Sequence, residues 1–232
     1  MTLALLAFGL SFILNLIIIL VARRLDWFID SLQKPQKFHS NPTPRAGGIG
    51  IFLPFLCLNS WLYLQNPSPL VLGFLCGGGI VFLSGIVEDF NASLSPKFRL
   101  FLQCLGSGIF IALSGIYLKD LGFGIHLPSY LGIPFTLFAL VGMINALNII
   151  DGFNGLASGI ALIALILIIS LGLPSTLSLS ILILIASILG FWLLNFPFGK
   201  IFLGDGGAYF LGFILASLLV GITQNPDRKS VV

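Results

Sequence analysis

Charged side chains are scarce in this sequence of 232 residues, where they make up 8% of the chain. About 25% is usual for soluble domains. Apolar residues make up 57%, and the mean hydropathy is +1.10. A soluble fold needs more polar side chains than this to cover its surface, whereas a lipid bilayer needs none. The composition therefore excludes a soluble domain and indicates an integral membrane protein.

Cysteine, histidine and net charge are low as well. The three cysteines, Cys57, Cys76 and Cys104, lie inside apolar runs with no CxxC pair and no adjacent histidine. We therefore expect small core hydrophobes rather than a disulfide or metal framework. The formal net charge of +3 is too small to indicate a nucleic-acid partner, and we expect none.

Long apolar runs are what the sequence does contain. A helix that crosses a hydrocarbon core of about 30 Å needs about 20 apolar residues. This template predicts an all-α fold, a polytopic transmembrane helix bundle with about eight spans. The predicted spans are 3–22, 46–64, 70–87, 98–117, 132–150, 157–172, 175–194 and 203–222. We expect one transmembrane domain over residues 1–222 and a short polar tail over 223–232.

Basic residues collect on one side of these alternating spans. That side has Arg23, Arg24, Lys34, Lys37, Arg45, Lys97, Arg99 and Lys200, whereas Lys119 lies in a connection on the other side, together with the terminal Arg228 and Lys229. The positive-inside rule then places the first side in the cytoplasm and the N-terminus outside.

Six of the eight acidic residues share the predicted cytoplasmic side, namely Asp26, Asp30, Glu88, Asp89, Asp151 and Asp205. Helix capping or snorkelling would explain one such acid alone. It explains the set less well, because an unpaired carboxylate against an apolar helix end is costly.

The short stretches of sequence around these acids also contain amides, glycines and basic side chains. Carboxylate and amide oxygens suit Mg²⁺, the lack of a His/Cys cluster argues against zinc, and Mg²⁺ in turn suggests a phosphate substrate. Asn145, Asn148 and Asp151 are three residues apart, so a helix would bring them toward one ligand. For the two asparagines, hydrogen bonding between helices is the alternative.

Lys97, Arg99 and Arg45 would supply positive charge for phosphate oxygens. His39 either lies at the same membrane face as these residues or is a solvated loop residue. Gly73 and Gly77 form a small-xxx-small pair that predicts close helix packing.

Four phrases in order carry a resemblance to a known family. They are Pro-Thr-Pro-Arg-x-Gly-Gly from residue 42, the acidic pair at 88–89, Asn-x-x-Asn-x-x-Asp-Gly-x-Asn-Gly-Leu-Ala-x-Gly from residue 145, and Phe-Leu-Gly-Asp-Gly-Gly from residue 202. Over about residues 1–222 the chain resembles the polyprenyl-phosphate N-acetylhexosamine-1-phosphate transferases, the bacterial glycosyltransferase family 4. The resemblance implies Mg²⁺-dependent transfer of a sugar 1-phosphate from a UDP-sugar to undecaprenyl phosphate, with release of UMP. It also implies a multi-pass protein of the cell inner (plasma) membrane, with its active site on the cytoplasmic face, that serves cell-envelope polysaccharide biosynthesis.

The resemblance also implies roles for particular residues. Asp205 matches the metal aspartate, and Asn148 an asparagine that can join it. Glu88 and Asp89, the acidic pair, and Asp151 match the catalytic carboxylates. The residues implied in substrate binding are His39, Arg45, Lys97, Asn145 and Asn154. Members usually have two aspartates at the acidic pair, so Glu88 is one methylene longer than the pattern.

Family members continue through further spans and an inner loop with a histidine cluster, whereas this chain ends after its eighth predicted span. A shortened product is the interpretation we favour, and a protein that does not need the loop is the other. A catalytically inactive, lipid-binding membrane subunit is an alternative function. An ion-coupled transporter is a weaker one, because we find neither acids at mid-span nor an inverted repeat. The sequence leaves open the sugar, the envelope pathway and the oligomeric state, a homo-oligomer included.

Overall fold

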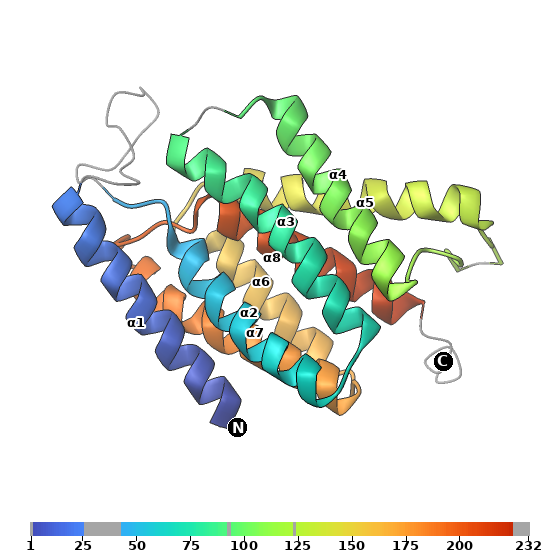
Figure 1. Cartoon of the computed structure of the whole chain (residues 1–232), viewed down its shortest axis with the longest axis horizontal. Coiled ribbons are helices and arrows are strands. Elements are labelled where there is room, and N and C mark those ends of the chain that lie inside the picture. The colour runs from blue at the N-terminus through green and yellow to red at the C-terminus, as the bar shows by residue number, and fades with distance from the viewer. Residues whose placement is uncertain (1, 26–42, 92–93, 123, 225–232) are drawn as a thin grey trace.

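The computed structural model describes residues 2–25, 43–91, 94–122 and 124–224. Eight helices lie within these ranges (Figure 1). They are α1 (Thr2–Leu25), α2 (Gly47–Gln65), α3 (Pro69–Asn91), α4 (Pro96–Ser114), α5 (Ser129–Ile150), α6 (Leu156–Ile169), α7 (Ser175–Asn195) and α8 (Gly204–Thr223). The predicted all-α transmembrane bundle is confirmed, and the side that the N-terminus faces stays a prediction.

Seven of these helices are long and apolar enough to cross a membrane, and α6 is the exception. Its 14 residues extend about 21 Å, which is short of a hydrocarbon core of about 30 Å. The predicted span 157–172 is therefore too long: the chain turns at Ser170–Gly172, and Gly172 has a positive φ of 70°. The apolar run alone did not show this end, because Leu171 and Leu173 continue it past the turn.

Local signals set the ends of α4. The Ser95 hydroxyl accepts a hydrogen bond from the Phe98 N–H at 3.3 Å, and Pro96 occupies the first turn, where its missing N–H costs nothing. Gly115 ends the helix in the left-handed conformation, with φ at 67°. These caps fix the direction in which α4 leaves the loop that follows α3.

Helix α8 forms the centre of the bundle. It packs against α2, α3, α5 and α6, and most of its side chains are buried (Figure 1). Helix α1 lies at the edge on α2 and α7. There the Ser11 hydroxyl donates to the carbonyl oxygen of Ser187 at 2.6 Å, a contact of the kind that joins helices in lipid. The first turn of α8 is thereby placed among the ends of several other helices.

Small residues let α3 and α4 approach closely, as predicted for Gly73 and Gly77. A Cβ atom at Gly77 would lie 2.6 Å from the carbonyl oxygen of Gly106, and one at Gly73 would lie 2.9 Å from the Phe110 ring. Neither space admits a larger residue without movement of the neighbouring helix. The prediction of close helix packing at this pair is confirmed.

The cysteines are free, as predicted, but two of them are not in the core. Cys57 and Cys76 are exposed on the outside of the bundle, and Cys104 is half-buried. The prediction of core positions was wrong for the first two because an apolar helix in lipid can turn any face outward. Hydropathy therefore did not distinguish lipid-facing from buried positions.

Candidate active site

The N-terminus of α8 is capped by a carboxylate from α3. Asp89 accepts the N–H of Asp205 on Oδ1 and the N–H of Gly206 on Oδ2, both at 2.9 Å. The first N–H groups of a helix have no partner within it, and the helix dipole favours an anion there. Asp89 therefore supplies a cap that no residue beside α8 in the sequence provides.

Two arginines approach the side chain of Asp205, which is 14% exposed. The Arg45 Nη2 lies 3.3 Å from Oδ1, and the Arg99 Nη1 lies 3.6 Å from Oδ2. The same nitrogen of Arg99 is 3.7 Å from Glu88 Oε1 and donates to the hydroxyl of Tyr209 at 3.3 Å. Arg99 thus connects the end of α3 to the first two turns of α8.

Backbone pairing places Arg45 in this cluster. The N–H of Phe202 donates to the carbonyl of Pro44 at 2.8 Å, and the N–H groups of Gly47 and Gly48 donate to the carbonyls of Phe202 and Leu203 at 2.9 and 2.8 Å. The segment before α2 therefore runs beside the segment before α8. This pairing brings the first and the last of the four phrases noted in the sequence together.

Glycines permit the close approach around α8. Gly204 has a positive φ of 77°, and a Cβ there would lie 2.7 Å from Asp89 Oδ2. A Cβ at Gly85 of α3 would lie 2.5 Å from the α8 backbone nitrogen of Gly206. One at Gly48 of α2 would lie 2.4 Å from the nitrogen of Gly207. Side chains at these positions would separate the carboxylates from their partners.

Asp151 follows the last residue of α5 and is partly buried. Its backbone N–H is bonded to the carbonyls of Leu147 and Asn148, but within the described ranges its carboxylate accepts no hydrogen bond. Burial raises the pKa of the Asp151 carboxyl from 3.8 to about 8; the Arg45 guanidinium opposes this rise, and the Asp205 and Asp89 carboxylates add to it. Asp151 therefore belongs to the same electrostatic cluster.

Asn145 bonds between helices, which is the alternative that the sequence left open. Its Nδ2 donates to Oε1 of Gln103 on α4 at 2.7 Å and to the Val141 carbonyl at 2.8 Å. Gln103 is 1% exposed and Asn145 is partly buried, so the pair links α4 to α5. The Asn148 side chain has no contact of this kind among the described residues.

One buried amide anchors the two loops that border the cluster. Asn195, at the end of α7, accepts the N–H of Gly155 on Oδ1 at 2.6 Å and donates to the Ile201 carbonyl at 2.7 Å. Gly155 opens α6, and Ile201 precedes α8. A Cβ at Gly199 would lie 2.7 Å from Nδ2 of Asn154, so Asn154 lies against the second loop.

The donor set of this cluster suits a hard cation. Glu88, Asp89, Asp151 and Asp205 offer carboxylate oxygens near two guanidinium groups, and oxygen ligands are those that Mg²⁺ prefers. In the described ranges, no group of three or more Asp, Glu, His or Cys side chains is placed so that it could hold a metal ion. Mg²⁺ commonly binds through one or two carboxylates together with substrate phosphates. Asp205 and Asp151 fit that mode of binding.

The predicted site residues do not all meet in the structure. The structure brings together Glu88, Asp89, Asp151, Asp205 and Arg45. It places Asn145 in a contact between helices, and it leaves Lys97 exposed without a side-chain contact in the described ranges. His39 lies outside the described residues, as do Asp26, Asp30, Lys34 and Lys37.

Three residues of the site were missed in the sequence. Tyr209, Gln103 and Asn195 are each at most 3% exposed and hold a charged or polar group of the site. A signal existed for each, since a polar side chain inside an apolar run is costly in lipid unless it has a partner. Their partners could not be found without the packing of the helices.

Comparison with known proteins supports what the geometry indicates. The model of glycosyl transferase family 4 matches residues 71–223, a range that contains Asp89, Arg99, Asp151 and Asp205. The chain belongs to this family.

Among its relatives, the probable undecaprenyl-phosphate N-acetylglucosaminyl 1-phosphate transferase of Bacillus subtilis is 33% identical over 97% of the chain. The undecaprenyl-phosphate alpha-N-acetylglucosaminyl 1-phosphate transferase of Yersinia pestis is 31% identical over 92% of it. The phospho-N-acetylmuramoyl-pentapeptide-transferase of Staphylococcus saprophyticus is 26% identical over 96%.

The chain spans 65%, 61% and 76% of the length of these three relatives. The members of this family are transferases. The names of the relatives and the seven apolar helices together identify the chain as a multi-pass membrane protein. The first two relatives thus extend well beyond the part that the chain matches.

Proposed function

We propose that this chain transfers N-acetylhexosamine 1-phosphate from a UDP-sugar to undecaprenyl phosphate and releases UMP, in cell-envelope polysaccharide biosynthesis. The observation that carries this proposal is the cluster around Asp205, where two guanidinium groups meet four carboxylates at the first turn of α8. Two of the relatives named above carry an undecaprenyl-phosphate acceptor and an N-acetylglucosaminyl 1-phosphate group in their names. UDP-N-acetylglucosamine is therefore the donor we propose first.

In the proposed reaction an oxygen of the lipid phosphate attacks the β-phosphorus of the UDP-sugar. A new bond forms between that oxygen and the β-phosphorus, and the bond from the β-phosphorus to the bridging oxygen breaks. UMP leaves with the bridging oxygen, and the sugar remains on a lipid diphosphate. Since no bond to carbon changes, catalysis rests on positioning and charge stabilisation.

The chain's own residues would supply most of that positioning. Arg45 and Arg99 can move from Asp205 to phosphate oxygens, which guanidinium groups bind with two parallel hydrogen bonds. Asp89 already has both oxygens bonded to the α8 backbone, so it holds the first turn in place rather than accepting a proton. A lipid phosphate needs little base catalysis, because its second pKa is about 6.

Mg²⁺ is the cofactor we propose, held by Asp205 and Asp151 with Asn148 as a further oxygen ligand; when bound, it would offset the negative charge of the diphosphate. Without a cation, the ionised carboxylates of the cluster would repel a UDP-sugar and offset its attraction to the two arginines. We also propose that the site faces the cytoplasm of the inner (plasma) membrane, since among the described residues the site end has Arg24, Arg45, Lys97, Arg99 and Lys200, against Lys119 at the other.

A phosphorus label tests the proposed bond change. UDP-N-acetylglucosamine labelled at the β-phosphorus is incubated with undecaprenyl phosphate, Mg²⁺ and membranes that contain the chain. We expect the β label to enter the organic phase and an α label to remain in the aqueous phase as UMP. Transfer of the sugar with neither label in the organic phase would overturn the proposal, and so would retention of both labels in water.

A further inference from the structure

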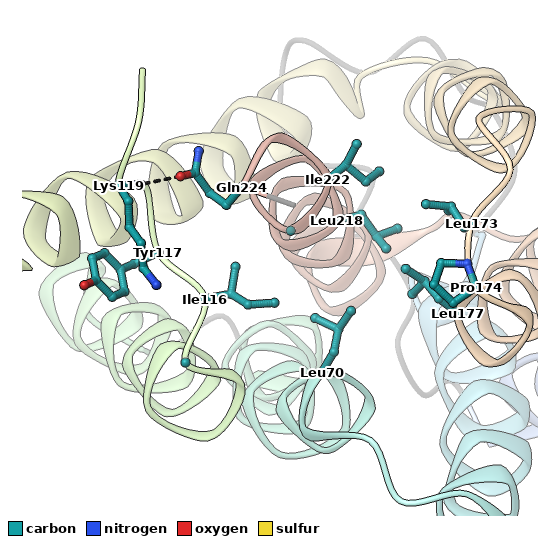
Figure 2. Close-up of a pocket in the computed structure, with 12 residues that line it drawn as sticks. Leu70, Ile116, Tyr117, Lys119, Leu173, Pro174, Leu177, Leu218, Ile222 and Gln224 are labelled. Atoms are coloured by element: carbon teal, nitrogen blue, oxygen red, sulfur yellow. Dashed lines mark hydrogen bonds between the residues drawn. The ribbon is translucent and has the colours of Figure 1, made fainter. Parts of the chain in front are cut away.

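A cavity of about 300 Å³ lies between the starts of α3 and α7 and the end of α8 (Figure 2). Leu70 at the start of α3, Leu177 near the start of α7 and Leu218 near the end of α8 line it. Each of these helices has a residue of the candidate active site at its other end. Along α8, the 13 residues from Asp205 to Leu218 extend about 20 Å. The cavity is therefore separate from the site.

The cavity is mostly apolar. Besides the three leucines, its walls include Ile116 and Ile222, and the side chains point toward one space in Figure 2. Pockets that hold small ligands usually have volumes of about 300–1,000 Å³ and apolar walls. At the lower end of that range, the space suits one segment of an alkyl chain rather than a whole lipid or a nucleotide.

A lysine is fixed at the rim of this cavity. The backbone N–H groups of Lys119 and Asp120 donate to Oε1 of Gln224 at 2.9 and 3.1 Å, and Nε2 of Gln224 donates to the Asp120 carbonyl at 3.0 Å. These bonds tie the segment after α4 to the end of α8 (Figure 2). The Lys119 ammonium lies 4.8 Å from the centre of the Tyr117 ring.

The ammonium of Lys119 has the Tyr117 ring beside it but no carboxylate partner inside the described part of the chain. Its side chain is exposed, and its ammonium forms no ion pair with any described carboxylate. An ammonium at the end of a transmembrane bundle attracts anionic lipid headgroups. An apolar space with one cation at its rim matches a lipid, which has a chain and a charged head, better than a free anion.

We propose that this cavity binds an anionic glycerophospholipid, with part of one acyl chain between α3, α7 and α8 and the headgroup phosphate against Lys119. The bound chain fills the space that Leu70, Ile116 and Leu177 leave open. The site is independent of the proposed transferase reaction, because it shares no residue with the acidic cluster.

Native mass spectrometry of the purified full chain tests the headgroup part. Phosphatidylglycerol and phosphatidylcholine with the same acyl chains are added, and the bound lipid is counted. We expect phosphatidylglycerol to bind about fivefold more tightly, as one lysine near a headgroup provides, and Lys119→Gln to remove that preference. Lys200→Gln is the matched control, since its ammonium also lies over a ring, that of Phe198 at 5.1 Å, at the other end of the bundle. An unchanged preference in Lys119→Gln, or an equal loss in Lys200→Gln, would overturn this part.

A second variant tests the cavity. A Cβ at Gly221 would lie 3.9 Å from Cδ1 of Ile116, so Gly221→Leu adds side-chain volume to the space without a backbone clash. We expect it to weaken the binding of both phospholipids at least about fivefold, whereas Gly142→Leu, at an open position on α5, leaves binding unchanged. Unaltered binding in Gly221→Leu would overturn the cavity assignment. Stronger displacement by undecaprenyl phosphate than by phosphatidylglycerol would assign the cavity to the acceptor lipid and overturn the phospholipid.

Discussion

At the scale of single residues, the neighbouring carboxylates of the cluster have different surroundings. Both oxygens of Asp89 accept backbone N–H bonds from α8, while the carboxylate of Asp151 accepts none in the described ranges. A carboxylate that caps a helix stabilises the fold, and a partly buried carboxylate near like charges destabilises it. The two residues should therefore respond to substitution with opposite changes in stability.

Asp89→Ala is expected to lower the free energy of unfolding by roughly 2 kcal/mol, because it leaves the N–H groups of Asp205 and Gly206 without their partner. Thermal unfolding of the detergent-solubilised chain measures this. Asp89→Asn retains one acceptor oxygen and should lose less. Equal stability of the alanine variant and the wild type would show that the cap contributes nothing.

Asp151→Asn is expected to raise the thermal midpoint at neutral pH and to reduce UMP release. Burial raises the pKa of Asp151 to about 8, so at neutral pH this carboxyl binds a proton in the folded protein, whereas it is ionised in the unfolded chain. This proton uptake lowers stability, and the amide removes that cost. The same scan of the apo protein, run beside a turnover assay, measures both effects. A loss of stability, or a gain of stability with full turnover, would contradict the proposed role of Asp151 as a metal ligand.

At the scale of elements, the close contact between α3 and α8 is what brings the acidic pair to Asp205. Gly85→Ala would place a Cβ 2.5 Å from the α8 backbone. We expect a loss of about 1–3 kcal/mol in stability, the usual cost of overpacking, together with a loss of activity. Gly79→Ala on the same helix is the control, because its Cβ would meet only Cζ of Phe52, at 4.0 Å. Similar unfolding temperatures for the two variants would show that the α3 and α8 backbones do not need this approach.

The helices themselves were predictable, because about 20 apolar residues between turn signals admit few other structures in lipid. The end of α6 was not, since Leu171 and Leu173 extend its apolar run beyond the turn at Gly172. Which helix faces turn outward was not predictable either, as Cys57 and Cys76 show. Lipid accepts an apolar side chain as readily as the core does, so hydropathy does not distinguish lipid-facing positions from buried ones.

For the candidate site, the sequence predicted the residue types and predicted that these residues lie on the same side of the membrane. It did not show that Asp89 caps α8, that Arg99 rather than Lys97 contacts Asp205, or that Asn145 bonds to Gln103. Each of these depends on the rotation of one helix against another. In the case of Asn195, a single buried amide bonds to two loops, at Gly155 and at Ile201, that lie far apart in the sequence.

At the scale of the whole molecule, the orientation in the membrane that we propose rests on the distribution of basic residues. Cysteine accessibility in intact cells tests it, with the native cysteines replaced by alanine. By the positive-inside rule, Lys119→Cys should react with a membrane-impermeant maleimide from outside, and Lys97→Cys should react after permeabilisation. The reverse pattern would place the candidate active site outside the cell.

The central claim is that the cluster around Asp205 transfers a sugar 1-phosphate, and the rate of UMP release tests it most directly. With UDP-N-acetylglucosamine, undecaprenyl phosphate and Mg²⁺, the wild-type chain should release UMP only when the acceptor is present. Asp205→Asn should reduce the rate at least about 100-fold. Asp120→Asn, at the opposite end of the bundle, should leave it unchanged. A wild-type rate in Asp205→Asn, or no acceptor-dependent UMP from the wild-type chain, would contradict the account.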